Sequence, residues 1–237
     1  MSRAGLLGGD ALPSWKAAVF LAALAWLPPA VLVTIQSLLH ESYSGWDYFL
    51  DGTVYTRYLV AIGAMLVTEK FADVRISLLV NQFLKAKLLG PAASEEFVSI
   101  VNKADRRSGS VVAEALILVL ALAWSWLSFY FVSSVSTSGW EEAVVNGESS
   151  LSWAGTLAEL VSNPIFLFLL FRWLWRFLVW TVLLFDISRL PLRLTAIHPD
   201  RAGGLAFLSI FPGVFGGLIF ALSCVVASSM LKTIDLI

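Results

Sequence analysis

An uncharged stretch near the start of the chain decides the fold class. It runs from Ala17 to Leu39 and reads AAVFLAALAWLPPAVLVTIQSLL, 23 residues without a charged side chain. A helix needs about 20 apolar residues to cross the hydrocarbon core of a bilayer, whereas the apolar core of a secretory signal has only about 7–15. The stretch therefore predicts a membrane-spanning helix, and Pro28 and Pro29 at its centre predict a kink or a break.

The composition extends this prediction to the whole chain. Of its 237 residues, 58% are hydrophobic and 14% are charged, and the mean hydropathy is +0.81. Soluble domains carry about 25% charged residues, so we expect an all-α, polytopic integral membrane protein in contact with the lipid bilayer. The 16 Lys and Arg side chains are offset by 17 Asp and Glu. Without a basic field, nucleic acid is not an expected partner.

Apolar segments predict five spans within a single transmembrane domain, residues 1–237. Their expected bounds are about 17–39, 54–69, 111–135, 165–185 and 204–231. Because the chain ends six residues after Leu231, truncation before a sixth span stays open.

The second span has two possible geometries, because Glu69, Lys70, Asp73 and Arg75 interrupt its apolar region. One helix could run from about residue 58 to 80 with these charges at mid-bilayer. Alternatively, a short span over 54–69 continues to about residue 88 as an amphipathic helix on the cytoplasmic surface. We favour the second geometry, since charges at mid-bilayer are costly and the apolar residues after 75 follow helical spacing.

The loops set the expected orientation. Basic residues gather in a helical loop over 81–110 and again between the fourth and fifth spans, whereas the loop over 136–163 is acidic. Cytoplasmic loops are enriched in Lys and Arg. We therefore expect a bacterial-type inner membrane protein with a cytoplasmic N-terminus, an extracytoplasmic C-terminus and an extracytoplasmic acidic loop. Trp140 and Trp153 in that loop are expected at the headgroup level.

Two arginines give the strongest functional signal. Arg172 and Arg176 lie four residues apart in the fourth expected span and share one helix face. An Arg at the centre of a membrane helix costs about 2.5–3.5 kcal/mol. Three interpretations stay open: a structural ion pair with Glu69, Asp73 or Glu114, an anion-attracting pore or cavity, or binding of lipid phosphates. Glu69 and Asp73 would form an ion relay only if they lie within the membrane.

The segment His198-Pro-Asp-Arg-Ala-Gly-Gly204 is the second candidate. Pro199 should end the preceding helix, and Asp200 should cap the next one. Alternatively, Arg201 and the N–H groups of the starting helix could bind an anion or a lipid headgroup. His198 could titrate near neutral pH and act as a cytoplasmic gate.

Small residues form a stripe in the last expected span. Ser209, Gly213, Gly217 and Ala221 repeat every four residues, a pattern that lets another helix approach closely. That helix could belong to the same chain or to another subunit.

These features lead to two functional hypotheses. We expect an oligomeric channel, conducting a small inorganic anion past Arg172 and Arg176 and with Glu69 and Asp73 as further ion-path candidates. The alternative is a non-transporting membrane scaffold, or partner-recruiting subunit, with a cytoplasmic interaction face. Neither a catalytic motif, a metal-ligand spacing nor a cofactor motif is visible in the sequence, so an enzyme is not expected.

Overall fold

The computed structural model describes residues 14–39, 45–86, 88–132, 140–145, 148–194 and 199–235. These are almost entirely helical, and their strands form one hairpin in which β1 (Glu142–Val145) pairs antiparallel with β2 (Glu148–Leu151). The α-helices are α1 (Ser14–Leu39), α2 (Trp46–Leu50), α3 (Gly52–Val54), α4 (Ile62–Lys85), α5 (Pro91–Ser108), α6 (Val111–Val132), α7 (Trp153–Leu157), α8 (Asn163–Ser188) and α9 (Gly216–Asp235). Two π-helical segments, η1 (Tyr55–Ala61) and η2 (Ala158–Ser162), and one 3₁₀ segment, η3 (Ala206–Phe215), complete them.

The fold confirms a helical protein of membrane type. Among the described residues, four helical segments are long and apolar enough to cross a membrane, namely Trp15–Leu39, Val111–Tyr130, Trp153–Ser188 and Ala206–Ile234. The expected span over 54–69 is not among them, because its helix also carries Arg57, Glu69, Lys70 and Asp73. The helix α1 continues through Pro28 and Pro29 without the predicted break.

Three long helical runs form the axis of the molecule. The elements α3, η1 and α4 follow one another from Gly52 to Lys85, α7, η2 and α8 from Trp153 to Ser188, and η3 and α9 from Ala206 to Asp235. At 1.5 Å per residue the first two runs are about 50 Å long, well beyond the roughly 30 Å of a bilayer core.

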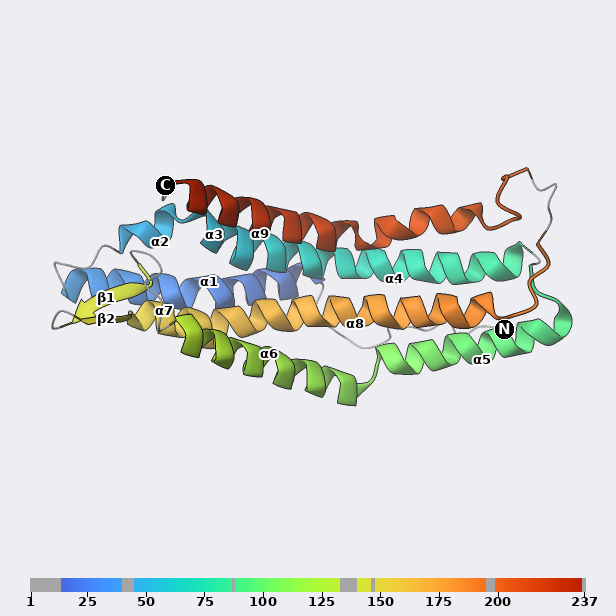
Figure 1. Ribbon diagram of the computed structural model, residues 1–237, viewed down its shortest axis with the longest axis horizontal. Helices are drawn as coiled ribbons and strands as arrows, with labels where there is room; N and C mark the ends of the chain where they lie inside the picture. Colours follow the sequence, from blue (N-terminus) through green and yellow to red (C-terminus); the bar gives the residue numbers. More distant parts are fainter. Residues whose placement is uncertain are drawn as a thin grey trace.

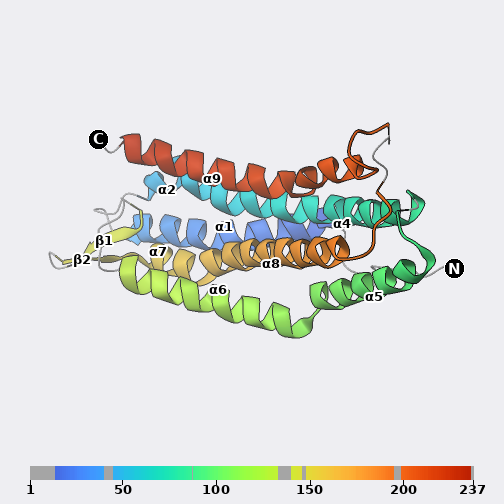
Figure 2. The ribbon, with the colours of Figure 1, turned by 45° about the vertical axis from the view of Figure 1, so that its right-hand side comes forward.

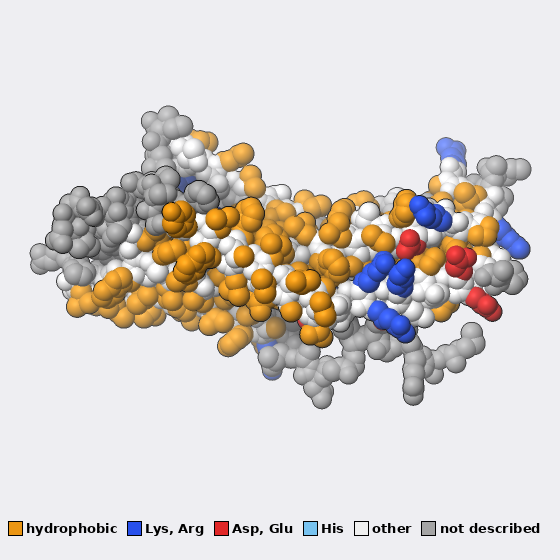
Figure 3. Space-filling view, turned by 60° about the horizontal axis from the view of Figure 1, so that its bottom comes forward, with side chains coloured by type: hydrophobic (Ala, Val, Ile, Leu, Met, Phe, Trp, Pro, Cys, Tyr) orange, Lys and Arg blue, Asp and Glu red, His pale blue; other side chains and the backbone are white. Residues whose placement is uncertain are grey.

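The shorter helices divide this bundle into two halves (Figures 1 and 2). At one end, α1 packs against α4, α6 against α8, and α9 against η1 and α4; we call these helices, with the first parts of the α4 and α8 runs, the five-helix half. At the other end, α5 packs against α8 and η3 packs against α4; we call these helices, with the last parts of α4 and α8, the four-helix half. On the face that Figure 3 shows, apolar side chains cover most of the described surface of the five-helix half, and charged ones gather on the four-helix half.

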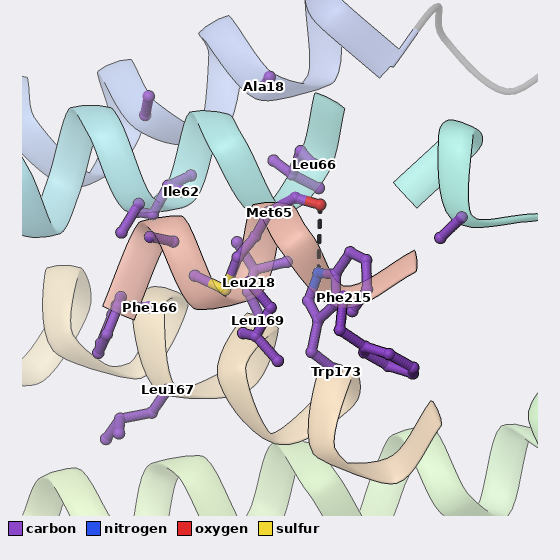
Figure 4. Close-up of a cluster of buried hydrophobic side chains, with 14 of the residues drawn as sticks. Ala18, Ile62, Met65, Leu66, Phe166, Leu167, Leu169, Trp173, Phe215 and Leu218 are labelled. Carbon is purple, nitrogen blue, oxygen red and sulfur yellow. Dashed lines mark hydrogen bonds between the residues drawn. The ribbon is translucent and has the colours of Figure 1, made fainter. Parts of the chain in front are cut away.

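Hydrogen bonds between helices fix how the runs align. The Ser162 hydroxyl donates to the Ala25 carbonyl at 2.6 Å, and the hydroxyls of Thr56 and Ser228 lie 2.6 Å apart. The buried contacts between α4, α8 and η3 include Met65, Trp173 and Phe215, with the Trp173 indole donating to the Met65 carbonyl at 3.1 Å (Figure 4). The α4 and α8 runs therefore lie parallel to each other, and the run of η3 and α9 lies antiparallel to both (Figure 1).

The expected amphipathic helix on the membrane surface is not confirmed. Residues 69–85 continue α4 without a break alongside α8 and η3 (Figure 1). Its apolar stripe packs inside the four-helix half, where the Phe83 ring lies 5.7 Å from the Phe97 ring and 4.9 Å from the Phe207 ring. Neighbouring helices of the same chain therefore cover the face that the sequence assigns to lipid.

Candidate functional site

The structure brings the four predicted ion-path residues together. Arg172 Nη2 lies 2.7 Å from Glu69 Oε1, and Arg176 Nη1 lies 3.0 Å from the same oxygen. Arg176 also pairs with Asp73. Since both pairs are spaced i, i+4, α8 presents two guanidinium groups to two carboxylates on the facing side of α4. We call these residues, with Glu114, the junction cluster.

Charge is compensated within the junction cluster. Glu114 of α6 adds a carboxylate 3.8 Å from Arg172 Nε, and the Arg176 guanidinium stacks 5.5 Å from the centre of the Trp173 ring. The side chain of Arg176 is 13% exposed and that of Arg172 33%. Each arginine therefore has a carboxylate partner in its own chain, as the structural-pair interpretation requires.

The junction cluster lies at the boundary between the two halves. Glu114 is in the first turn of α6, and the Trp175 indole donates to the carbonyl of Arg107, near the end of α5, at 3.2 Å. The helical run that contains Arg172 already begins at Trp153, rather than near residue 165 as expected. Arg172 consequently comes at the end of the stretch beside α6 and not in its middle.

The stripe of small residues faces α4 of the same chain. A β-carbon at Gly217 would overlap the Thr68 side chain, and one at Gly213 would lie 3.1 Å from Arg75 Nη1. Arg75 donates to the Gly213 carbonyl at 3.2 Å, and Ala221 is fully buried. Close packing inside the chain therefore accounts for Gly213, Gly217 and Ala221, whereas Ser209 is exposed.

The loop before η3 is organised by Asp200. Its carboxylate accepts the backbone N–H groups of Ala202, Gly204 and Ala206 at 2.9, 3.0 and 3.1 Å. Arg201 has a positive φ of 54° and an exposed side chain. The predicted capping role fits this geometry, whereas His198 lies outside the described residues.

Sequence reasoning missed a charged site inside the five-helix half. Glu159 of η2 accepts a hydrogen bond of 2.9 Å from Asn163 Nδ2 and lies within electrostatic reach of Arg57 of η1. Arg57 Nε is buried without a hydrogen-bond partner among the described residues. The neighbouring bond from Ser162 to Ala25 puts this site near the middle of α1.

Both members of the Arg57–Glu159 site lie in π-helical segments. Such segments are rare and occur frequently at functional sites. The available signal is Arg57 alone in the first part of the expected span 54–69, whereas Glu159 falls within the segment 136–163, which the sequence predicts as an acidic loop.

A second unpredicted cluster connects α9 to the segment before α3, at the end of the five-helix half that carries the β-hairpin. Lys232 Nζ lies 2.6 Å from Asp51 Oδ2, to which the Trp140 indole also donates at 3.1 Å. Burial opposes ionisation of Asp51, yet hydrogen bonds from Lys232, Thr53 and Trp140 hold its pKa below the ordinary value. Trp140 is only 3% exposed, so it is not the predicted headgroup anchor, whereas Trp153 is 61% exposed.

Neither a search for metal-binding groups nor comparisons with known proteins point to a function. Over the described ranges, no group of three or more His, Cys, Asp or Glu residues could hold a metal ion. No protein-family model, curated protein or solved structure matches the chain.

Proposed function

We propose that the five-helix half spans the membrane and that the junction cluster marks its inner boundary. In this placement the second span begins with α3 and comprises about residues 52–69, close to the 54–69 expected from the sequence. The helix α6 begins beside Glu114, and α9 begins next to the close contact between Gly217 and Thr68. Each membrane segment then has the roughly 20 residues that a bilayer requires.

The four-helix half is proposed to lie in the cytoplasm of a bacterial-type cell. Its basic residues include Lys85, Lys103, Arg106, Arg107 and Arg189, and cytoplasmic segments next to membrane helices are enriched in such residues. The chain then has a cytoplasmic N-terminus and an extracytoplasmic C-terminus, with the β-hairpin outside.

The function that the geometry supports best is that of a membrane scaffold with a cytoplasmic interaction face. One observation carries this proposal: Arg172 and Arg176 are each paired with a carboxylate of the same chain. Groups compensated in this way join helices and do not offer uncompensated charge to a passing anion. Continuous helices moreover extend from one half into the other, so the cytoplasmic half is held firmly to the membrane.

An apolar stripe on α4 is the proposed interaction face. Phe71, Val74 and Leu78 are spaced for one side of a helix and are 64%, 61% and 61% exposed. They lie in the four-helix half, where an exposed apolar stripe of this kind is unusual unless a partner covers it.

An oligomeric channel is the second candidate, and the Arg57–Glu159 site favours it. Ionisable residues at mid-membrane depth mark ion or proton pathways more often than chance. In the channel proposal, the ion path follows η1 and η2, and the junction cluster holds the helices together at the cytoplasmic end of that path.

Reconstitution in liposomes separates the two candidates. The scaffold predicts anion flux equal to that of protein-free liposomes, together with a specific cross-linked product in cells from a photoreactive residue at Val74. The matched control is the exposed polar position Asn102 on α5, which should give no such product. Protein-dependent flux that Arg57→Gln abolishes would establish the channel in place of the scaffold.

A further inference from the structure

A groove lies on the outside of the bundle where α5 meets α6. Its volume is about 510 Å³. Lys103, Arg106 and Arg107 from the last turns of α5 line one end, and Leu116 and Leu120 of α6 with Trp175 of α8 line the rest.

The basic end of the groove carries uncompensated charge. None of its three basic side chains forms an ion pair with any part of the chain that the structure describes, in contrast to Arg172 and Arg176 close by. Lys103 and Arg106 are exposed. An anion bound here would meet three positive charges.

The other end of the groove is apolar and belongs to a membrane-spanning helix. Leu116 and Leu120 are 64% and 51% exposed on α6, one turn apart along the candidate span Val111–Tyr130. From Val112 to Leu120 the wall extends about 12 Å along the helix axis. The indole of Trp175, bonded to the Arg107 carbonyl at 3.2 Å, holds α8 against the elbow between α5 and α6.

We infer that this groove binds one anionic phospholipid of the cytoplasmic leaflet. Its phosphate lies on Lys103, Arg106 and Arg107, and one acyl chain lies along α6. Only an amphipathic anion uses both ends of the groove, and a free phosphate would contact the basic end alone. The inference rests on the proposed membrane placement but not on the scaffold or channel function.

Native mass spectrometry of the full chain in non-ionic detergent tests the inference directly. Phosphatidylglycerol and phosphatidylcholine with identical acyl chains are the probes. Because each basic residue near a lipid surface contributes about 1 kcal/mol, three should favour phosphatidylglycerol by roughly 100-fold. The variant K103Q/R106Q/R107Q should lose this preference. The control K85Q/R189Q/R201Q removes the same charge from the same half and should keep it.

A second variant tests the apolar end with all charges intact. Leu116→Trp places a larger side chain in the apolar part of the groove and should weaken phosphatidylglycerol binding without lowering protein stability. This variant keeps the inference testable if the triple variant fails to fold. Equal binding of both lipids by the native chain, or equal losses in the triple variant and its control, would overturn the inference. Competition by inorganic phosphate at the concentration of the lipid would instead identify a free-anion site and reject the lipid.

Discussion

Arg176 donates a hydrogen bond of 3.0 Å to the carboxylate of Glu69 and so joins α8 to α4 at the boundary between the two halves of the bundle. The same guanidinium pairs with Asp73 one turn further along α4. Three charged side chains thus connect two helices that continue from the five-helix half into the four-helix half. A hinge at this level would have to break these contacts, so we expect the halves to move together.

Replacing Gly217 by alanine, which adds only one methyl group, should lower the stability of the protein. Gly217→Ala forces a β-carbon into Thr68, and overpacking of this kind costs about 1–3 kcal/mol. The adjacent Gly216 is the control, because a β-carbon there meets nothing within 4 Å and alanine has the higher helix propensity. Thermal unfolding in detergent should show a lower midpoint for Gly217→Ala alone. Equal midpoints for both variants would mean that α4 and α9 do not pack closely here.

Asp51 should stabilise the end of the five-helix half that carries the β-hairpin, and should do so in a pH-dependent way. At neutral pH, Asp51→Asn leaves Lys232 without its carboxylate and should lower the free energy of unfolding by about 3 kcal/mol. Because the folded pKa of Asp51 lies below its ordinary value, this stabilisation is complete above about pH 4, the ordinary range of an Asp. It is lost as the pH falls through the lower, folded pKa.

Chemical unfolding of both proteins between pH 7 and pH 3 measures this dependence. The difference between native chain and variant should be constant to about pH 5 and shrink below about pH 4. Asp47→Asn, at an exposed position on α2, should show no difference at any pH. A difference that already shrinks between pH 7 and pH 5 would exclude the ionised, hydrogen-bonded Asp51.

Asp200 should hold the loop before η3 closed to proteases. Asp200→Ala removes the acceptor of three backbone N–H groups, and a loss of about 1.4 kcal/mol in local stability raises the open population about tenfold. Trypsin cleavage after Arg201, followed by mass spectrometry, should accelerate accordingly. Asp105→Ala, at an exposed position on α5, should leave this rate unchanged, and equal rates in both variants would show that the carboxylate does not order the loop.

Hydropathy predicted the helical membrane fold because an apolar run of about 20 residues has the length of a helix that crosses a bilayer. The four segments Trp15–Leu39, Val111–Tyr130, Trp153–Ser188 and Ala206–Ile234 overlap four of the five expected spans. The error at the fourth lay at its start: Trp153 to Ser162 looked like the end of an acidic loop, since Glu159 interrupts it. A charge with Asn163 as hydrogen-bond partner is tolerated inside a bundle, and hydropathy alone does not register that compensation.

The sequence could predict which charged side chains pair with Arg172 and Arg176, but not where along the bundle these ion pairs lie. In one of the three interpretations, the sequence offered Glu69, Asp73 or Glu114 as partners of Arg172 and Arg176, and all three carboxylates lie next to these arginines. Their depth depends on how α6 aligns with α8, and therefore on contacts such as that of Glu114 with Arg172. The contact between Lys232 and Asp51 gave no sequence signal, because 181 positions of the chain separate the two residues.

Anion flux and stability, measured together on Arg176 variants, test whether the junction cluster joins helices and does not conduct. Arg176→Leu should lower the free energy of unfolding by about 3 kcal/mol, and the double variant with Asp73→Leu should recover part of that loss. Flux into liposomes should equal that of protein-free liposomes for the native chain and both variants. Unchanged stability of Arg176→Leu, together with an altered protein-dependent anion flux, would show that the junction cluster lines a conduction path and does not join the helices.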